Sequence, residues 1–154
     1  MNGLELLKED HRKAQGLFKQ VRATDNERQH KQLYKKIKTE VETHTYIEEK
    51  VLYPALKKYE EFRDVAFEAV EEHLQVKTLF RDIDRLPDGS ERFEAKLMVL
   101  VENVEHHIEK EEGEMFTQVE RRFSEEQLED LGRELEAAKK EFGKKPRAKA
   151  ASSR

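Results

Sequence analysis

Histidine and glutamate side chains recur along this chain at the spacing of metal ligands. The first half has a lone histidine and then a histidine followed four residues later by a glutamate, and the second half repeats this order. The six residues are His11, His44, Glu48, His73, His107 and Glu111. Imidazole beside carboxylate is the ligand combination that suits iron, manganese or zinc. The chemistry that these residues could carry is that of a bound transition metal.

The repetition extends to the neighbours of these residues. His44 and Glu48 precede His107 and Glu111 by 63 residues, and His11 precedes His73 by 62. An acidic residue stands before each lone histidine with a phenylalanine seven residues after it, and a second glutamate and an aromatic residue follow each ligand glutamate. These flanking residues are Asp10, Phe18, Glu49 and Tyr53 in the first half, and Glu72, Phe80, Glu112 and Phe116 in the second. The sequence therefore contains an internal duplication of a ligand set.

Apolar residues with helical spacing predict the elements that must position these ligands. They recur every three or four residues, and the stretches are 4–21, 33–55, 66–83, 93–115 and 128–142. All six candidate ligands fall on the apolar stripes. Within each His-x-x-x-Glu pair the two side chains lie one helical turn apart on one face, so both can reach the same metal.

Breaks between these stretches predict how the helices connect. Thr24 and Asp25 are expected to end the first helix and cap the second, and Pro54 should kink the second just past Glu48. Leu86–Ser90 reads as a loop, and Ser124 with Gln127 has the form of a capping box. We therefore predict an all-α fold, an antiparallel up-down four-helix bundle over 1–122. A short fifth helix over 123–142 should pack outside it, followed by a disordered basic tail over 143–154.

Glu48 and Glu111 on a buried seam require compensation. An unpaired buried carboxylate costs several kcal/mol, and no Lys or Arg occupies the inner seam at these levels. Taken singly, a seam histidine is more often a hydrogen-bonded core residue and a seam glutamate more often a solvated flank residue. The six together, in a repeated order, favour a metal site over that interpretation.

Composition limits the other classes of function. The chain has 154 residues, no cysteine and 42% charged residues, which favours one helical domain without disulfides or thiolate metal sites. No apolar run could span a bilayer and no apolar secretion segment begins the sequence, so a cytoplasmic protein without membrane association is expected. From Gly143 onward the chain has five basic residues and no acidic one, so the preceding body is more acidic than the net charge of −4. Nucleic acid is not the expected partner.

The arrangement of these motifs resembles the hemerythrin-like, or HHE cation-binding, family in its bacterial single-domain type. The resemblance covers about residues 4–122, and it rests on the ligand order and on the stretches 6–11, 47–54 and 111–116. It implies an antiparallel four-helix bundle around two non-haem iron ions, bridged by two carboxylates and an oxo or hydroxo group. It further implies that Glu48 and Glu111 bridge the irons. The terminal ligands would be His11, His44, His73 and His107.

Two departures from the oxygen-carrying hemerythrins affect the expected chemistry. Their fifth histidine is replaced by Lys77, and their last carboxylate follows its histidine by five residues, whereas Glu111 follows His107 by four. His106 would restore that spacing, but it lies off the apolar seam, so His107 is favoured and His106 remains an alternative or supporting ligand. Lys77 could hydrogen-bond an iron-bound oxygen, although extension into solvent is favoured.

Three further residues lie outside the ligand set. His30 is predicted to lie on the surface, and Tyr46 lies off the apolar seam. Tyr53 is expected to fill the core with its hydroxyl hydrogen-bonded.

Ligand counting then gives the expected function. Four histidines, two bridging glutamates and an oxygen bridge leave two positions open on a pair of octahedral irons, which suits peroxide disproportionation or redox sensing at least as well as reversible O2 carriage. The favoured hypothesis is a di-iron protein that binds O2, NO or peroxide, with catalase-like activity as a possible turnover. The alternatives are an iron- or oxygen-sensing or metal-binding interaction module without turnover, and a metal-free or mononuclear structural bundle. The sequence does not indicate an oligomeric state.

Overall fold

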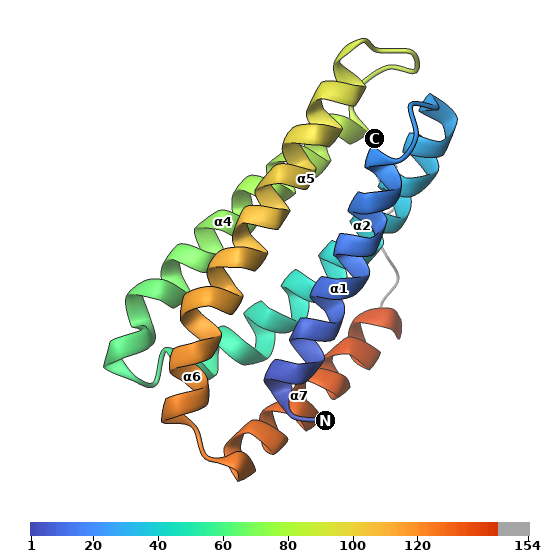
Figure 1. Ribbon diagram of the computed structural model, residues 1–154. Helices are drawn as coiled ribbons and strands as arrows, with labels where there is room; N and C mark the ends of the chain where they lie inside the picture. Colours follow the sequence, from blue (N-terminus) through green and yellow to red (C-terminus); the bar gives the residue numbers. More distant parts are fainter. Residues whose placement is uncertain (145–154) are drawn as a thin grey trace.

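The computed structural model describes residues 1–144. Of the predicted basic tail, 143–154, Gly143 and Lys144 belong to the last helix and the rest lies outside the described residues. Every regular element within residues 1–144 is helical (Figure 1). The elements are α1 (Gly3–Arg22), α2 (Glu27–Ile47), the π-helix η1 (Glu48–Leu52), α3 (Tyr53–Leu56), α4 (Glu60–Asp84), α5 (Arg92–Lys110), the π-helix η2 (Glu111–Met115), α6 (Phe116–Arg122) and α7 (Glu125–Lys144). Within residues 1–144, none of these helices is long and apolar enough to cross a membrane.

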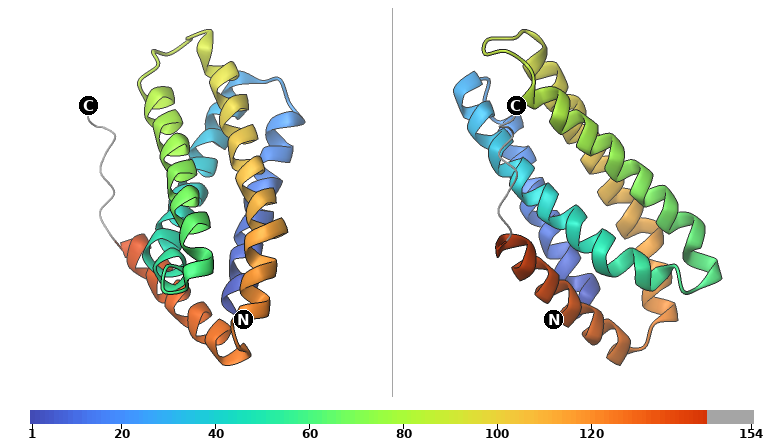
Figure 2. Two further views of the ribbon diagram at one scale, coloured as in Figure 1. Left: turned by 90° about the vertical axis from the view of Figure 1, so that its left-hand side faces the viewer. Right: turned by 180° about the vertical axis from the view of Figure 1, so that it is seen from behind.

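Four long helical rods form the predicted antiparallel bundle. α2, η1 and α3 follow one another without a break and make one rod, and α5, η2 and α6 make another. α1 packs on α2 and α4 packs on α5, so each half of the chain is a helical hairpin. α7 packs on the outside of the bundle against α1 and α2 (Figure 2). The predicted fold class is confirmed.

A layer of polar side chains divides the apolar core into two clusters. The cluster next to α7 includes Leu7, Ile47 and Leu135, and the cluster toward the α4–α5 loop includes Phe18, Ile37 and Leu97. Histidines and glutamates on the inner faces of the four rods lie between them and are buried. The helical periodicity of the apolar residues thus places the polar layer in the interior.

Both rods that carry a ligand glutamate change from α- to π-helix at that glutamate. The backbone N–H of Tyr53 donates to the carbonyl of Glu48, five residues earlier, and the N–H of Phe116 donates to the carbonyl of Glu111 in the same way. Pro54 was predicted to disturb the helix here because it lacks an N–H. Its counterpart 63 residues later is Thr117. Since both halves have the π-helical turn, proline alone does not account for it.

The extra residue in each π-helical turn rotates the residues that follow. Val51 and Ala55, which the regular spacing places on the buried stripe, are only half-buried, whereas Leu52, Tyr53 and Leu56 are buried. A π-helical turn therefore brings the fifth residue after each glutamate onto the same face as that glutamate.

Local sequence signals mark most helix ends. Asn2 and Glu5 form a capping box at the start of α1, and Ser124 and Gln127 form the predicted one before α7. The N-cap of α2 is Asn26, not Thr24 or Asp25, and its side chain accepts from the backbone N–H of Gln29. Asparagine is preferred at the N-cap as strongly as aspartate, so the cap predicted at Asp25 lies one residue before the observed one.

α7 is fixed to the bundle by apolar contacts and by close backbone packing. Leu128, Leu131, Leu135 and Ala138 are buried. Gly132 faces the first residues of the chain, and a Cβ at this position would lie 2.4 Å from the backbone oxygen of Met1. Glycine is needed here for close approach, because any side chain would push α7 away from the start of α1.

We predict that Gly132→Ala lowers the free energy of unfolding by about 1–3 kcal/mol, since the obstructing atoms are backbone and cannot rotate away. Gly16→Ala is the matched control, because a Cβ at this α1 position meets nothing within 4 Å. The control should stabilise the protein by roughly 0.5–1 kcal/mol. Urea denaturation of both variants measures the difference, and equal effects would contradict the packing described for α7.

Candidate metal centre

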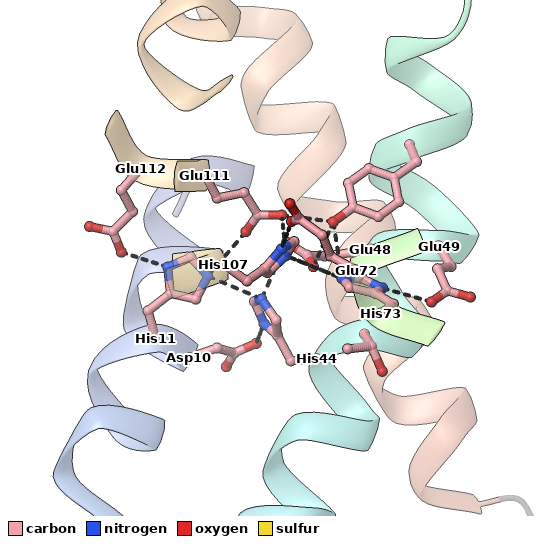
Figure 3. A network of polar contacts seen from close by, with 12 residues as sticks. Asp10, His11, His44, Glu48, Glu49, Glu72, His73, His107, Glu111 and Glu112 are labelled. Carbon is pink, nitrogen blue, oxygen red and sulfur yellow. Dashed lines mark hydrogen bonds and ion pairs between the residues drawn. The ribbon is translucent and has the colours of Figure 1, made fainter. Parts of the chain in front are cut away.

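The structure brings the six predicted residues together in the polar layer (Figure 3). His11 comes from α1, His44 from the end of α2, His73 from α4 and His107 from the end of α5. Glu48 and Glu111 are the first residues of the two π-helices. Two groups of four side chains have ligand atoms within 4.8 Å of one another, and both glutamates belong to both groups. The histidines of one group are His11 and His44, and those of the other are His73 and His107.

The two glutamates face the histidine rings. Each carboxylate has oxygens close to histidine Nε2 atoms, with 3.2 Å between His44 and Glu48, 3.2 Å between His11 and Glu111, and 3.2 Å between His107 and Glu111. Glu48 Oε2 and Glu111 Oε1 are nevertheless buried with no hydrogen-bond partner among the described residues. Buried, unsatisfied carboxylate oxygens beside imidazole nitrogens fit a bound cation.

Each histidine is oriented by a carboxylate on its other ring nitrogen. His44 Nδ1 donates to Asp10 over 3.0 Å, and His107 Nδ1 donates to Glu72 over 2.6 Å. His73 Nδ1 lies 2.7 Å from Glu49, and His11 Nδ1 lies 2.5 Å from Glu112. With Nδ1 protonated, the Nε2 atom of a neutral imidazole carries a lone pair directed into the centre. Such carboxylate–histidine pairs are typical of metal sites.

The duplication therefore extends to the acidic residues beside the ligand candidates. The four orienting carboxylates are the immediate neighbours of ligand candidates in the chain, before each lone histidine and after each glutamate. The sequence signal for their role was an acidic residue at the same position beside each lone histidine and each ligand glutamate in both halves.

A cation neutralises each of these four carboxylates in turn. Lys139 donates to Asp10 and Lys110 donates to Glu72. Lys77 donates to Glu49 and Arg12 donates to Glu112. With the orienting carboxylates compensated in this way, Glu48 and Glu111 are left to be balanced by positive charge at the histidines or between them.

The structure also gives the positions of Lys77, His106 and His30, which lie outside the six ligand candidates. Lys77 Nζ donates to Glu49 over 3.1 Å, and its side chain is 44% exposed. It therefore contacts the carboxylate that orients His73 and reaches it from the surface. His106 is exposed and belongs to neither metal-capable group of the described residues. The surface prediction for His30 is wrong, because its ring is buried and its Nε2 contacts the backbone oxygens of Val21 and Thr24. Its polar contacts to the turn between α1 and α2 explain the burial.

Tyr53 is the residue whose closeness to the centre the sequence analysis did not anticipate. It is buried with its hydroxyl hydrogen-bonded, as expected, but the hydroxyl lies 3.0 Å from Glu48 Oε1 and 2.7 Å from Glu111 Oε2. Burial and the two carboxylates raise the pKa of Tyr53 well above its usual value, so the phenol keeps its proton. The corresponding residue in the second half, Phe116, stacks on the His11 ring. The centre is therefore polar on one side and apolar on the other.

Comparison with known proteins agrees with this geometry. The model of the hemerythrin HHE cation binding domain matches residues 2–119, and the chain belongs to this family. A crystal structure of an HHE cation-binding domain-containing protein from Mycobacterium kansasii, an Rv2633c homolog, is similar with a TM-score of 0.76 and 27% identity, over 92% of this chain and 87% of that one. A DNA nickase from Nostoc sp. is 26% identical over 139 residues, which are 90% of this chain but 39% of the nickase.

Electrostatics indicate what balances the glutamates in the absence of metal. Burial alone would lower the pKa of His44, but the charges of Glu48 and Asp10 outweigh it and raise the pKa to about 10. The pKa of His107 is raised as well, since its carboxylate partners outweigh burial. Protons on the histidines and cations between them are thus alternative sources of positive charge in this layer.

We predict that metal-free protein loses stability as pH rises. His44 has a higher pKa in the folded chain than its ordinary 6.5, so its contribution is complete below about pH 6.5 and disappears as pH rises toward about 10. Chelator-treated protein should lose on the order of a few kcal/mol of unfolding free energy over this range in urea titrations. Metal-loaded protein is the control and should keep its stability, because metal binding requires the deprotonated imidazole. Equal stability of the metal-free protein at both ends of the range would contradict the prediction.

Proposed function

We propose that the chain holds two non-haem iron ions in the polar layer and reacts with a small oxidant such as O2, NO or hydrogen peroxide. One ion would be held by His11 and His44 and the other by His73 and His107, with Glu48 and Glu111 shared between them. The observation that carries the proposal is the pair of four-residue groups with both buried carboxylates in common. When bound, an iron pair supplies the two electrons that such an oxidant exchanges.

A small apolar cavity beside the histidines favours a small, uncharged ligand. It has a volume of about 30 Å³ and reaches His44, His73 and His107. Its remaining lining is mainly aliphatic: Ala14, Glu40, Val41, Thr45, Val76, Val104 and Ile108. A space of this size admits a molecule comparable with water and excludes a larger organic substrate. Aliphatic walls disfavour anions, because an ion would lose its hydration without gaining a partner.

Tyr53 does not line this cavity but bonds both carboxylates from the side of the other apolar cluster, and through them it would supply the proton that reduction of an oxidant requires. Its hydroxyl donates to Glu111 Oε2 over 2.7 Å. A positioned proton donor typically contributes about 10²–10⁴-fold to rate. This donor favours turnover of peroxide over a metal-binding module without turnover. The nicking activity named for the Nostoc relative does not extend to this chain on that likeness, since the match spans 39% of that protein.

The ligand assignment predicts different consequences for two adjacent histidines. His107→Gln should reduce the bound iron from two ions per chain toward one, because His107 belongs to one of the two metal-capable groups. His106→Gln is the matched control on the exposed face of α5 and should retain both ions. Elemental analysis of proteins loaded anaerobically with ferrous iron measures the outcome. Equal iron content in the two variants would refute the assignment of His107.

The proton-donor role predicts a kinetic defect in Tyr53→Phe. This variant keeps the aromatic ring but removes the hydroxyl, so iron content should be retained while the initial rate of peroxide decomposition falls by about 10²-fold. Tyr34→Phe is the matched control, because the Tyr34 hydroxyl donates to Asp84 in the other apolar cluster. An unchanged rate in Tyr53→Phe excludes the tyrosine as donor. A wild-type protein that binds iron without consuming peroxide favours the sensing alternative.

A further inference from the structure

The outer helix α7 contributes a charged side chain to the polar layer. Lys139 on α7 donates from Nζ to Asp10 Oδ1 over 2.6 Å. The other oxygen of Asp10, Oδ2, accepts from His44 Nδ1 over 3.0 Å. Two consecutive hydrogen bonds thus connect a helix outside the bundle to a candidate ligand inside it.

Among the four orienting carboxylates, Asp10 has a distinct environment. Glu49, Glu72 and Glu112 are 22–28% exposed, and their cations come from the bundle helices α4, α5 and α1. The Asp10 side chain is 2% exposed and receives its cation from α7. Water can solvate the other three carboxylates when a cation is lost, whereas the buried Asp10 is far less accessible to it. The charge on Asp10 therefore depends on Lys139 more strongly than the other three depend on their cations.

α7 carries none of the six ligand candidates and lies outside the four rods that do. The four rods surround the polar layer, and α7 packs from outside against α1, α2 and η1. The apolar contacts of α7 lie in the cluster next to it, while Lys139 reaches past them to Asp10. The Lys139–Asp10 ion pair hence joins the packing of α7 to the orientation of the His44 ring.

We propose that Lys139 is a positioning residue that couples the docking of α7 to metal occupancy at His11 and His44. The proposal rests on the proposed metal-binding function and adds a means of regulating it. Coupling of this kind is reciprocal, so metal binding should tighten α7 and docked α7 should slow metal release. Occupancy of one half of the centre would then be detectable on the outer surface of the protein, where a regulator could act on α7.

The experiment uses the full chain loaded anaerobically with ferrous iron and, in parallel, with zinc. Lys139→Met removes the charge, and Lys139→Arg restores it. Lys140→Met is the matched control, since Lys140 is the exposed neighbour of Lys139 on the same helix. Lys110→Met removes the cation of Glu72, the duplicated counterpart of Asp10. Two quantities are measured: the rate of metal release to a chelator, and hydrogen exchange of residues 125–144 with and without metal.

In the wild type, metal should slow hydrogen exchange of α7. In Lys139→Met this dependence should disappear, and about half of the metal should be released roughly tenfold faster, as expected when a partner of a ligand histidine is disturbed. Lys139→Arg and Lys140→Met should behave as the wild type. Lys110→Met should accelerate release from the other half and leave the exchange of α7 unchanged.

The outcomes separate this proposal from the one on which it rests. Exchange of α7 that does not respond to metal in the wild type, or that still responds in Lys139→Met, overturns the coupling and leaves the metal centre standing. Binding of zinc but not iron overturns the iron assignment alone. Failure of the wild type to bind either metal overturns both proposals.

Discussion

Two buried carboxylates set the main constraint on this structure. Glu48 and Glu111 lie in the middle of a four-helix bundle with apolar clusters on either side, where an uncompensated charge costs several kcal/mol. The surrounding residues are arranged to meet that cost. Histidines face the two carboxylates, other carboxylates orient the histidines, and lysines and an arginine neutralise those carboxylates in turn. Positive charge at the centre itself, from protons or metal, completes the balance.

The duplication explains why this arrangement is nearly symmetric, and the exceptions indicate where function is specialised. Ligand candidates, orienting carboxylates and π-helical turns occur in both halves at matching positions. The symmetry is broken by Tyr53 opposite Phe116, which gives one side of the centre a proton donor. It is broken again by Lys139, which brings α7 to one half only.

The sequence predicted the fold and the membership of the polar layer well, because both depend on periodicity. An apolar stripe at helical spacing specifies which face of a helix is buried, so the sequence alone places His11 and Glu111 on the buried face. It predicted Tyr53 as a core residue but not its contact with the two glutamates, since a regular α-helix puts Val51 and Ala55 on the seam, and the π-helical turn moves Tyr53 there instead.

Contacts between distant helices were equally out of reach. The pairing of Lys139 with Asp10, and the burial of His30, depend on where elements pack and not on local pattern. Asn26 was missed as a cap for a different reason, because three neighbouring polar residues compete for one position.

The division of the centre between two helical hairpins gives the short connection at residues 57–59 a role of its own. The two histidines of each metal-capable group come from one hairpin. Each group also includes one glutamate from that hairpin and one from the other. A single hairpin thus supplies two histidines and only one of the two shared carboxylates, and it could complete a group only with a second copy. Joining the two hairpins by a few residues replaces that bimolecular encounter with an intramolecular one at high effective concentration. The chain is in this sense a tethered dimer, in which the tether frees the two halves to diverge.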